Sequence, residues 1–132
     1  MFANNSLGVL NFAFPDVALV PAAPKPVPTP FPNQAFSSAH IPSVLNVIFG
    51  GGLAENLLTT GTVSSGDEAG VLLGVISKEG AGPDRPFVGS FKILIGAMFA
   101  TRMTTITGQN GMVANAVGVS LTPGQVRVIL LS

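Results

Sequence analysis

Short apolar runs, separated by turn-forming residues, dominate the chain from residue 44 onward. Five runs are expected to form strands: 44–49, 71–76, 87–95, 103–107 and 126–131. Runs of about five to nine residues rich in Val, Ile, Phe and Thr, with Gly, Pro, Asn and Asp between them, are typical of an all-β domain. Because the runs alternate only weakly between apolar and polar residues, we expect burial on both faces or pairing with another chain.

Two of these regions follow one plan at a separation of 46 positions. The aligned positions are 47–50 with 93–96, Ala54 with Ala100, Leu57 with Met103 and Thr59 with Thr105. Each unit contains an apolar strand, a glycine break and a return segment that carries a threonine. Internal repetition of this kind predicts two β-rich units with a common structure, at 44–61 and 88–107.

The first residues of the chain have a looser pattern. Residues 1–20 alternate between apolar and small polar types around several phenylalanines. Gly8 and Pro15 interrupt any helical period, so we expect an extended segment.

The next segment, 21–33, is rich in proline, which favours polyproline II. Two interpretations stay open for it. It is either a disordered linker or an ordered strap that buries Phe31 and Phe36 against the domain. A single helical turn is compatible with 34–39. Residues 108–118, rich in Gly, Asn and Ala, are expected to form a loop, with a short helical turn as the alternative.

Charged residues are scarce in this chain. Apolar residues make up 47% and charged residues only 9%, whereas roughly a quarter of the residues of a typical soluble protein are charged. We therefore expect a partner to cover part of the apolar surface. The length of 132 residues suits one domain, spanning 1–132. Within it, 1–43 is expected to be an extended N-terminal segment and 44–132 the β-rich body.

Charge and residue types exclude several classes of protein. Six basic and six acidic residues cancel, so neither a nucleic-acid footprint nor a polybasic membrane patch is expected. The chain has no cysteine for disulfides or thiolate metal sites. The apolar segment 93–100 is far shorter than the ~20 residues that span a bilayer. No Lys or Arg precedes Lys25, and Pro15 and Asp16 interrupt the first segment, so no cleaved signal peptide is expected.

Few residues offer catalytic or ligand chemistry. The glycines at 50–52 are followed by Leu-Ala-Glu instead of Lys and Ser or Thr, which predicts a turn and not a phosphate loop. Adjacent Asp67 and Glu68 are not expected to act as an acid/base pair; Asp67 is expected to cap or close a turn. His40 is the only histidine, so a structural role is expected. Arg102 is either a partner-facing guanidinium or a clamp on loop carbonyls.

Four short motifs occur in the order found in one family. They are Asn-x-x-Phe-Pro-Asp-Val at 11–17, Pro-x-Pro-Phe-Pro-Asn at 28–33, Gly-Asp-Glu-Ala-Gly at 66–70 and Pro-x-Gln-x-Arg-Val at 123–128. In addition, 88–102 looks like the repeat of PAAR proteins, with Phe-Ala-Thr-Arg where that family has Pro-Ala-Ala-Arg. The more divergent Leu-Ala-Glu-Asn at 53–56 is its counterpart. Nearly end to end, the chain resembles the PAAR-like proteins of type VI secretion.

The resemblance implies a small conical all-β domain with pseudo-threefold quasi-repeats and an extended Pro-rich N-terminal strap. Such a domain is a monomer that caps and sharpens the trimeric spike of a contractile injection system and can carry or recruit an effector. Residues 44–61 and 88–107 would be two walls of the cone. Residues 126–131 would belong to the third, although they lack room for the glycine return.

The resemblance also implies synthesis in the bacterial cytoplasm and export through the secretion apparatus without a cleaved signal peptide. Whether the domain stands alone or is excised from a longer toxin stays open. An alternative function is an adaptor that recruits a separate toxin or chaperone through the Pro-rich segment. A small hydrolase using His40 and a serine is a weaker alternative because no matching motif is present. We expect no enzymatic activity.

The chain departs from the family in one respect. PAAR proteins bind zinc near the apex through histidines and a cysteine, whereas this chain has one histidine and no cysteine. Neither zinc nor another cofactor is therefore expected. We expect apolar packing and the Pro-rich segment to replace the metal.

The residues expected to contact the spike or a cargo lie in the family motifs and on the apolar edges of the repeats. They are Phe14, Pro15, Asp16, Pro30, Phe31, Pro32, Asn33, Gly89, Ser90, Ile93, Ile95, Arg102, Val126 and Val128. No residue is expected to be catalytic, to bind a cofactor or to bind a metal.

Overall fold

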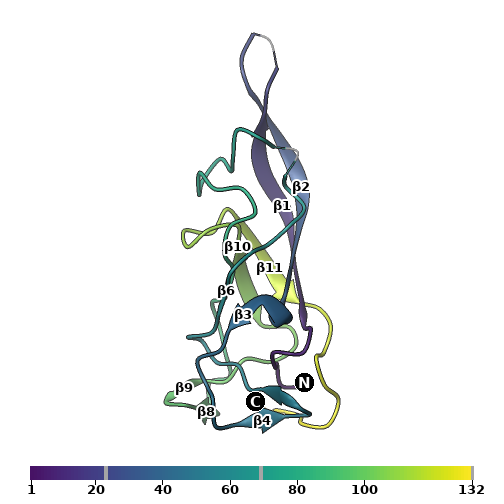
Figure 1. The fold of residues 1–132 in the computed structure, drawn as a ribbon, viewed down its shortest axis with the longest axis vertical. Helices are drawn as coiled ribbons and strands as arrows, with labels where there is room; N and C mark the ends of the chain where they lie inside the picture. Colours follow the sequence, from purple (N-terminus) through teal and green to yellow (C-terminus); the bar gives the residue numbers. More distant parts are fainter. Residues whose placement is uncertain (23, 69, 132) are drawn as a thin grey trace.

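The computed structural model of the chain is a cone with one pointed and one broad end (Figure 1). It describes residues 1–22, 24–68 and 70–131. Within these residues the regular structure is β, as expected, apart from one 3-10 turn, η1, at Ser37–Ala39. In the same part of the chain, no helix is long and apolar enough to cross a membrane.

The strands include two long ones near the N-terminus and many short ones after them. They are β1 (Leu10–Val20), β2 (Val27–Phe36), β3 (His40–Ile41), β4 (Ile48–Phe49), β5 (Gly52–Leu53), β6 (Thr60–Gly61), β7 (Arg85–Pro86), β8 (Leu94–Ile95), β9 (Met98–Phe99), β10 (Ile106–Gln109) and β11 (Ala116–Ser120). The loop between β1 and β2 forms the pointed end, and β4, β8, β9 and both termini lie at the broad end (Figure 1).

A five-stranded antiparallel sheet, in the order β2-β1-β11-β10-β7, forms the body of the cone. The predicted extended segment 1–20 contributes β1, which pairs with β2 on one side and β11 on the other. The register of β1 against β2 shifts between Ala13 and Asp16, which leaves Phe14 and Pro15 in an irregular stretch. Such irregularities bend a strand and alter its twist.

The Pro-rich segment is neither a linker nor a separate strap. Its residues from 27 onward form β2, whose Pro28 and Pro30 pair with Leu19 and Val17 of β1. Because proline cannot donate a hydrogen bond to β1, the nitrogens of both prolines face the outer edge of the sheet. That edge therefore presents no backbone donor at these two positions, which hinders pairing with a strand of another molecule.

Two predictions about local structure in the upper part are wrong. The expected strand 71–76 is a series of turns that touches β1 through one bridge, between Gly74 and Ala18. The expected loop 108–118 contains the end of β10 and the start of β11. Gly118, which suggested a loop, is required by the sheet, because a Cβ there would overlap the carbonyl oxygen of Phe12 on β1.

Two hairpins at the broad end confirm the internal repeat. Ile48 pairs with Leu53 in β4/β5, and the residues 46 positions later, Leu94 and Phe99, pair in β8/β9. The strands are shorter than the apolar runs 44–49 and 87–95 predicted, because only the residues next to the turn are paired. We call these hairpins, with the residues leading into them, the first and second walls.

The third wall comes from both ends of the chain. Ile129 forms a bridge with Phe2 that corresponds to the pairs in the other two hairpins. The N–H of Ala3 donates to the carbonyl of Val128 (3.0 Å), as Ala54 donates to Val47 and Ala100 to Ile93 (both 2.9 Å). Residues 126–131 therefore belong to the third wall, as expected. The return segment that they lack is supplied by the N-terminal residues.

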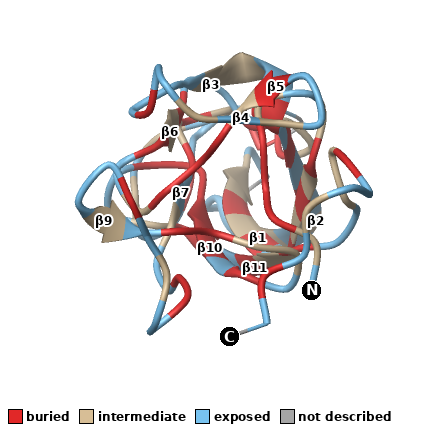
Figure 2. Cartoon of the chain, turned by 90° about the horizontal axis from the view of Figure 1, so that it is seen from below, coloured by how far each residue is buried: buried red, intermediate tan, exposed pale blue. Residues whose placement is uncertain are grey.

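Closed rings of backbone hydrogen bonds join the three walls. The N–H of Asn4 donates to Thr101, Thr101 donates to Glu55, and Glu55 donates back to Asn4 (3.1, 3.2 and 3.4 Å). A second set of bonds links the walls in the opposite sense: Ser6 donates to Leu53, Leu57 to Phe99 and Met103 to Phe2 (2.8–3.1 Å). Figure 2, which looks along the cone from below, shows β4/β5, β9 and the termini at three places around the axis. One chain thus builds a pseudo-threefold structure.

The interior of the cone is unusually polar. Buried Asn, Asp, Ser and Thr side chains outnumber buried apolar ones among the described residues. The apolar cluster at the broad end consists of Ala3, Val44, Ala54, Ile95, Ala100 and Leu130. Many large apolar side chains consequently lie on the outside of the molecule.

Candidate functional site

Exposed apolar side chains repeat around the broad end. Leu45, Phe91 and Val126 occupy equivalent positions on the three walls and are 67–80% exposed. Three residues further along each wall, Ile48, Leu94 and Ile129 are 54–64% exposed. Exposed apolar surface of this kind usually marks an interaction site. We call these six residues the base ring.

One hollow includes a residue of the base ring, and another lies within the second repeat unit. One, of about 250 Å³, is lined by the apolar residues Met1, Phe2, Met103 and Ile129 of the third wall and its neighbour. The other, of about 190 Å³, is lined by Val88, Gly89, Arg102, Thr104, Thr105 and Ile106. The second hollow therefore brings together two predicted contact residues, Gly89 and Arg102.

The other predicted contact residues of the walls differ in exposure. Val126 belongs to the base ring, while Ile93 and Val128 are half-buried and pack against the apolar cluster. Ile95 is buried within that cluster. Ser90 is also buried, and its hydroxyl accepts the backbone N–H groups of Lys92 and Ile93 (3.3 and 3.2 Å). The prediction that Ile95 and Ser90 contact a partner is therefore corrected. Both side chains are buried, and both stabilise the second wall.

The predicted contact residues of the N-terminal motifs are divided in the same way. Phe14, Pro15, Pro30 and Pro32 are exposed on the sheet, and Phe31 is half-buried. In contrast, Asp16 and Asn33 are fully buried. Neither side chain is available to a partner, so their assignment as contact residues is wrong.

Asp16 and Asn33 belong to a buried polar network that the sequence analysis missed. Asn33 Nδ2 donates to Asp16 Oδ2 (2.6 Å), and Asn115 Nδ2 donates to Asp16 Oδ1. Asn110 Nδ2 donates both to Asp16 Oδ1 (3.3 Å) and to Asp67 Oδ2 (2.5 Å). Three sequence motifs, at 11–17, 28–33 and 66–70, therefore meet at one place. We call these five residues the amide network.

The amide network keeps two carboxylates away from water. Burial raises the pKa of Asp67, and the charge of Asp16 adds to the effect. A buried carboxylate is tolerated only when hydrogen bonds replace its hydration, and the three asparagine amides and the N–H of Ala81 (3.2 Å to Asp67 Oδ1) do so. Asp67 therefore does more than close a turn. Its exposed neighbour Glu68 accepts the N–H of Gly66 (2.7 Å).

His40 lies buried between two carboxylates. Its Nδ1 is 2.7 Å from Glu55 Oε1 and its Nε2 is 3.3 Å from Asp84 Oδ2, with all three side chains at most 5% exposed. Burial opposes a charge on the ring, but Asp84 and Glu55 together outweigh it and raise the pKa of His40 to about 10. Burial likewise raises the pKa of Glu55. The ring is thus a cation at neutral pH, which fits the structural role expected for it.

The three residues come from different parts of the fold. His40 is in β3 and pairs with Gly61 of β6, while Glu55 belongs to the first ring of backbone hydrogen bonds. Gly61 also exchanges backbone hydrogen bonds with Asp84 (2.7 and 3.3 Å). A Cβ at Gly61 would overlap Asp84 Oδ1, so only glycine brings the two strands close enough. The ion pairs of His40 therefore tie the walls to the body of the cone.

The donor set of this chain does not fit the zinc site of PAAR proteins. Both ring nitrogens of the single histidine already face carboxylates. Over residues 1–22, 24–68 and 70–131, no three His, Cys, Asp or Glu side chains are grouped so that they could hold a metal ion. A structural zinc site usually needs four Cys, His or carboxylate ligands.

Comparison with known proteins identifies a family. A family model described as a Toxin PAAR-like domain matches residues 9–118, which include the long sheet and the first two walls. The match leaves out most of the third wall, at 1–8 and 119–132. No curated protein and no solved structure matches.

The buried histidine predicts how stability depends on pH. Below about pH 6.5 both the folded and the unfolded chain hold the proton, so the ion pairs contribute fully. As the pH rises toward about 10, only the folded chain binds the proton, and the free energy of unfolding falls by up to ~1.4 kcal/mol per pH unit. NMR should show the single imidazole resonance titrating near pH 10. A midpoint near 6.5 would contradict the ion pairs.

A His40→Gln variant is the matched control for this pH dependence. It should be less stable by about 3–5 kcal/mol, because two buried carboxylates lose their cation. It should also lose the slope between pH 7 and 10. The chain has no Tyr or Cys, so the remaining titration in that range is common to both proteins. An equal slope in both would refute the role of His40.

The amide network predicts a large effect of an isosteric change at Asp16. In an Asp16→Asn variant an amide group faces the Nδ2 groups of Asn33 and Asn115, and the unfolding free energy should fall by about 2–4 kcal/mol. Glu68→Gln, in the exposed neighbour of Asp67, should stay within about 0.5 kcal/mol. Urea unfolding followed by far-UV circular dichroism measures both, since the chain has no Trp or Tyr. Unchanged stability of Asp16→Asn would show that the network is not structural.

Proposed function

Because the chain belongs to the toxin PAAR-like domain family, we propose that it is the tip that caps the trimeric spike of a type VI secretion system and sharpens it. The observation that carries the proposal is the base ring. A trimer ends in three equivalent surfaces, and a single chain can match all three only if it repeats one surface three times. The base ring repeats two large apolar positions on each of three walls.

The composition supports a face that is covered in the assembled state. The cone places polar side chains inside and large apolar side chains outside, with only 9% charged residues to keep it soluble. Burial of the base ring against apolar side chains of the spike would stabilise the complex by about 25 cal/mol for each Å² removed from water. The central, most apolar part of an interface usually contributes most of its affinity.

The opposite end of the molecule suits a role at the front of an injected assembly. The hairpin of β1 and β2 narrows to a point beyond the rest of the sheet (Figure 1). The prolines of β2 leave its outer edge without donors at two positions, which limits strand addition. In this proposal the chain is made in the bacterial cytoplasm, leaves through the secretion apparatus and has no enzymatic activity.

The proposal also assigns the stabilising role of zinc to other groups. In place of the metal, the ion pairs of His40 join the walls to the sheet, and the amide network joins three segments of the upper cone. This differs from the expectation that apolar packing and a proline strap replace the metal. Elemental analysis of the purified chain should find zinc far below one equivalent.

The tip function is tested by binding to the cognate trimeric spike. One copy of this chain should co-elute with three spike chains. A Leu94→Glu variant should bind at least about 100-fold more weakly, because an unpaired charge buried in an interface costs about 3 kcal/mol or more. The matched control is Ile76→Glu, an equally exposed apolar position outside the base ring (62% against 61%).

Two outcomes would count against the tip function. The first is that the wild-type chain and the spike elute separately. The second is that Leu94→Glu and Ile76→Glu weaken the complex equally. Circular dichroism of both variants should match the wild type, which separates a lost contact from a lost fold.

A second candidate function is an adaptor that holds an effector or chaperone at the pointed end. The observation that favours it is the exposure of the described residues of the segment 21–26, which lie beyond the last β1–β2 pair, Val20 with Val27.

Because 27–36 form β2, deletion of 21–33 would disrupt the sheet. Replacing 21–26 with Asn-Gly keeps the hairpin through a two-residue turn. This variant should bind the spike normally, and it should lose the cargo if the adaptor role is correct. Retention of the cargo would exclude that role.

A further inference from the structure

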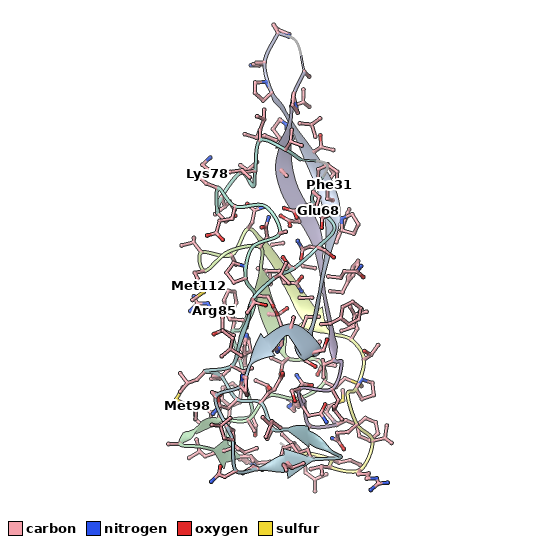
Figure 3. All side chains as sticks on the ribbon, in the orientation of Figure 1. Phe31, Glu68, Lys78, Arg85, Met98 and Met112 are labelled. Carbon is pink, nitrogen blue, oxygen red and sulfur yellow. The ribbon has the colours of Figure 1, made fainter. Side chains whose placement is uncertain are left out.

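The acidic side chains that are not buried lie in the upper part of the cone, whereas exposed basic side chains occur both there, as in Lys78, and at the broad end. Four of the six acidic residues are buried: Asp16, Glu55, Asp67 and Asp84. Figure 3 places Glu68 in the upper half of the cone, level with the turns that carry Lys78, and Glu79 follows Lys78 in the chain. At the broad end, Lys92 and Arg127 are exposed. Among the described residues, the fully exposed charged side chains next to the base ring are therefore all basic.

The two basic residues occupy equivalent positions. Lys92 follows Phe91 of the base ring, and Arg127 follows Val126. The corresponding residue of the first wall, after Leu45, is Asn46, which is exposed as well. Beside the base ring, two walls thus present a cation, Lys92 or Arg127, and the first wall presents the neutral amide of Asn46. We call these three equivalent positions the corners of the apolar face.

We infer that the surface that covers the base ring has an apolar centre surrounded by three symmetry-equivalent carboxylates, two of which pair with Lys92 and Arg127. This inference rests on the proposed function. A trimer places the same group opposite each corner, and a carboxylate both attracts the two cations by its charge and accepts a hydrogen bond from the Asn46 amide. Complementary charges of this kind raise association rates and select partners more than they add affinity.

The charge pattern argues against two other occupants of this face. A second copy of this chain would bring Lys92 and Arg127 toward the same residues of its partner, and like charges repel. An anionic lipid surface would attract the two cations, but it would not require three equivalent apolar corners. Because the trimer is symmetric, the three rotational positions of the cap on it are equivalent.

The experiment measures binding of the full chain to the cognate spike trimer at about 50 mM and about 500 mM salt, conditions of weak and strong screening. The double variant Lys92→Asn, Arg127→Asn has asparagine at all three corners, as the first wall does at Asn46. This variant should bind about 5- to 20-fold more weakly than wild type at low salt, with most of the loss in the association rate. The difference should nearly vanish at high salt. Asn46→Lys adds the missing cation and should strengthen low-salt binding about two- to fivefold.

The outcomes separate this inference from the proposed function. One outcome is that wild type binds, Leu94→Glu does not, and neither charge variant alters affinity or salt dependence. In that case the tip function stands, and the inferred carboxylates around the apolar centre, which we call the acidic surround, are refuted. Weaker binding by Asn46→Lys would refute it too, because it would indicate a basic surround. If wild type does not bind the trimer, both fail. Binding to anionic vesicles that is lost in the double variant, or a dimer of the chain through the base ring, would also overturn the inference.

Discussion

The close approach of three backbone segments around one axis is the constraint on which the broad end depends. Each segment donates one hydrogen bond to the next, so the ring of Asn4, Thr101 and Glu55 closes only when all three walls are present. Fully buried alanines, Ala3, Ala54 and Ala100, precede these ring residues. A larger side chain there would overpack the apolar cluster and push the walls apart. The hairpins, and with them the base ring, are placed by this junction.

A narrow cone around such a junction has little room for large apolar side chains. Its interior is filled by amides, hydroxyls and carboxylates, which are tolerable only with nearly complete hydrogen bonding. In the interior, the cationic ring of His40 offsets two carboxylates at once. Large apolar side chains are consequently on the outside, which gives this weakly charged chain an extensive apolar surface.

The repeat could be predicted because its chemistry is local. In both units a threonine hydroxyl, of Thr59 or Thr105, accepts a backbone N–H three residues earlier (3.2 and 3.0 Å), so the spacing within each unit is conserved along the chain. The third wall could be assigned only in part, because its two strands are at opposite ends of the chain and share no local motif. The amide network was missed for a similar reason: Asn110 and Asn115 reach Asp16 across 94 and 99 positions, from a segment whose glycines indicated a loop.

Several residues of the family motifs have buried side chains that form hydrogen bonds within the cone. A short motif shows which residues recur but not whether their side chains face solvent, and in Asp16, Asn33 and Asp67 they face one another. In this chain these hydrogen bonds hold the upper part of the cone together. Specificity for one partner must then come from positions that the fold leaves free. The exposed residues that differ between equivalent corners, Asn46 and Lys92 among them, are such positions, because exchanging one for another changes the charge of the face and leaves the hydrogen bonds of the walls intact.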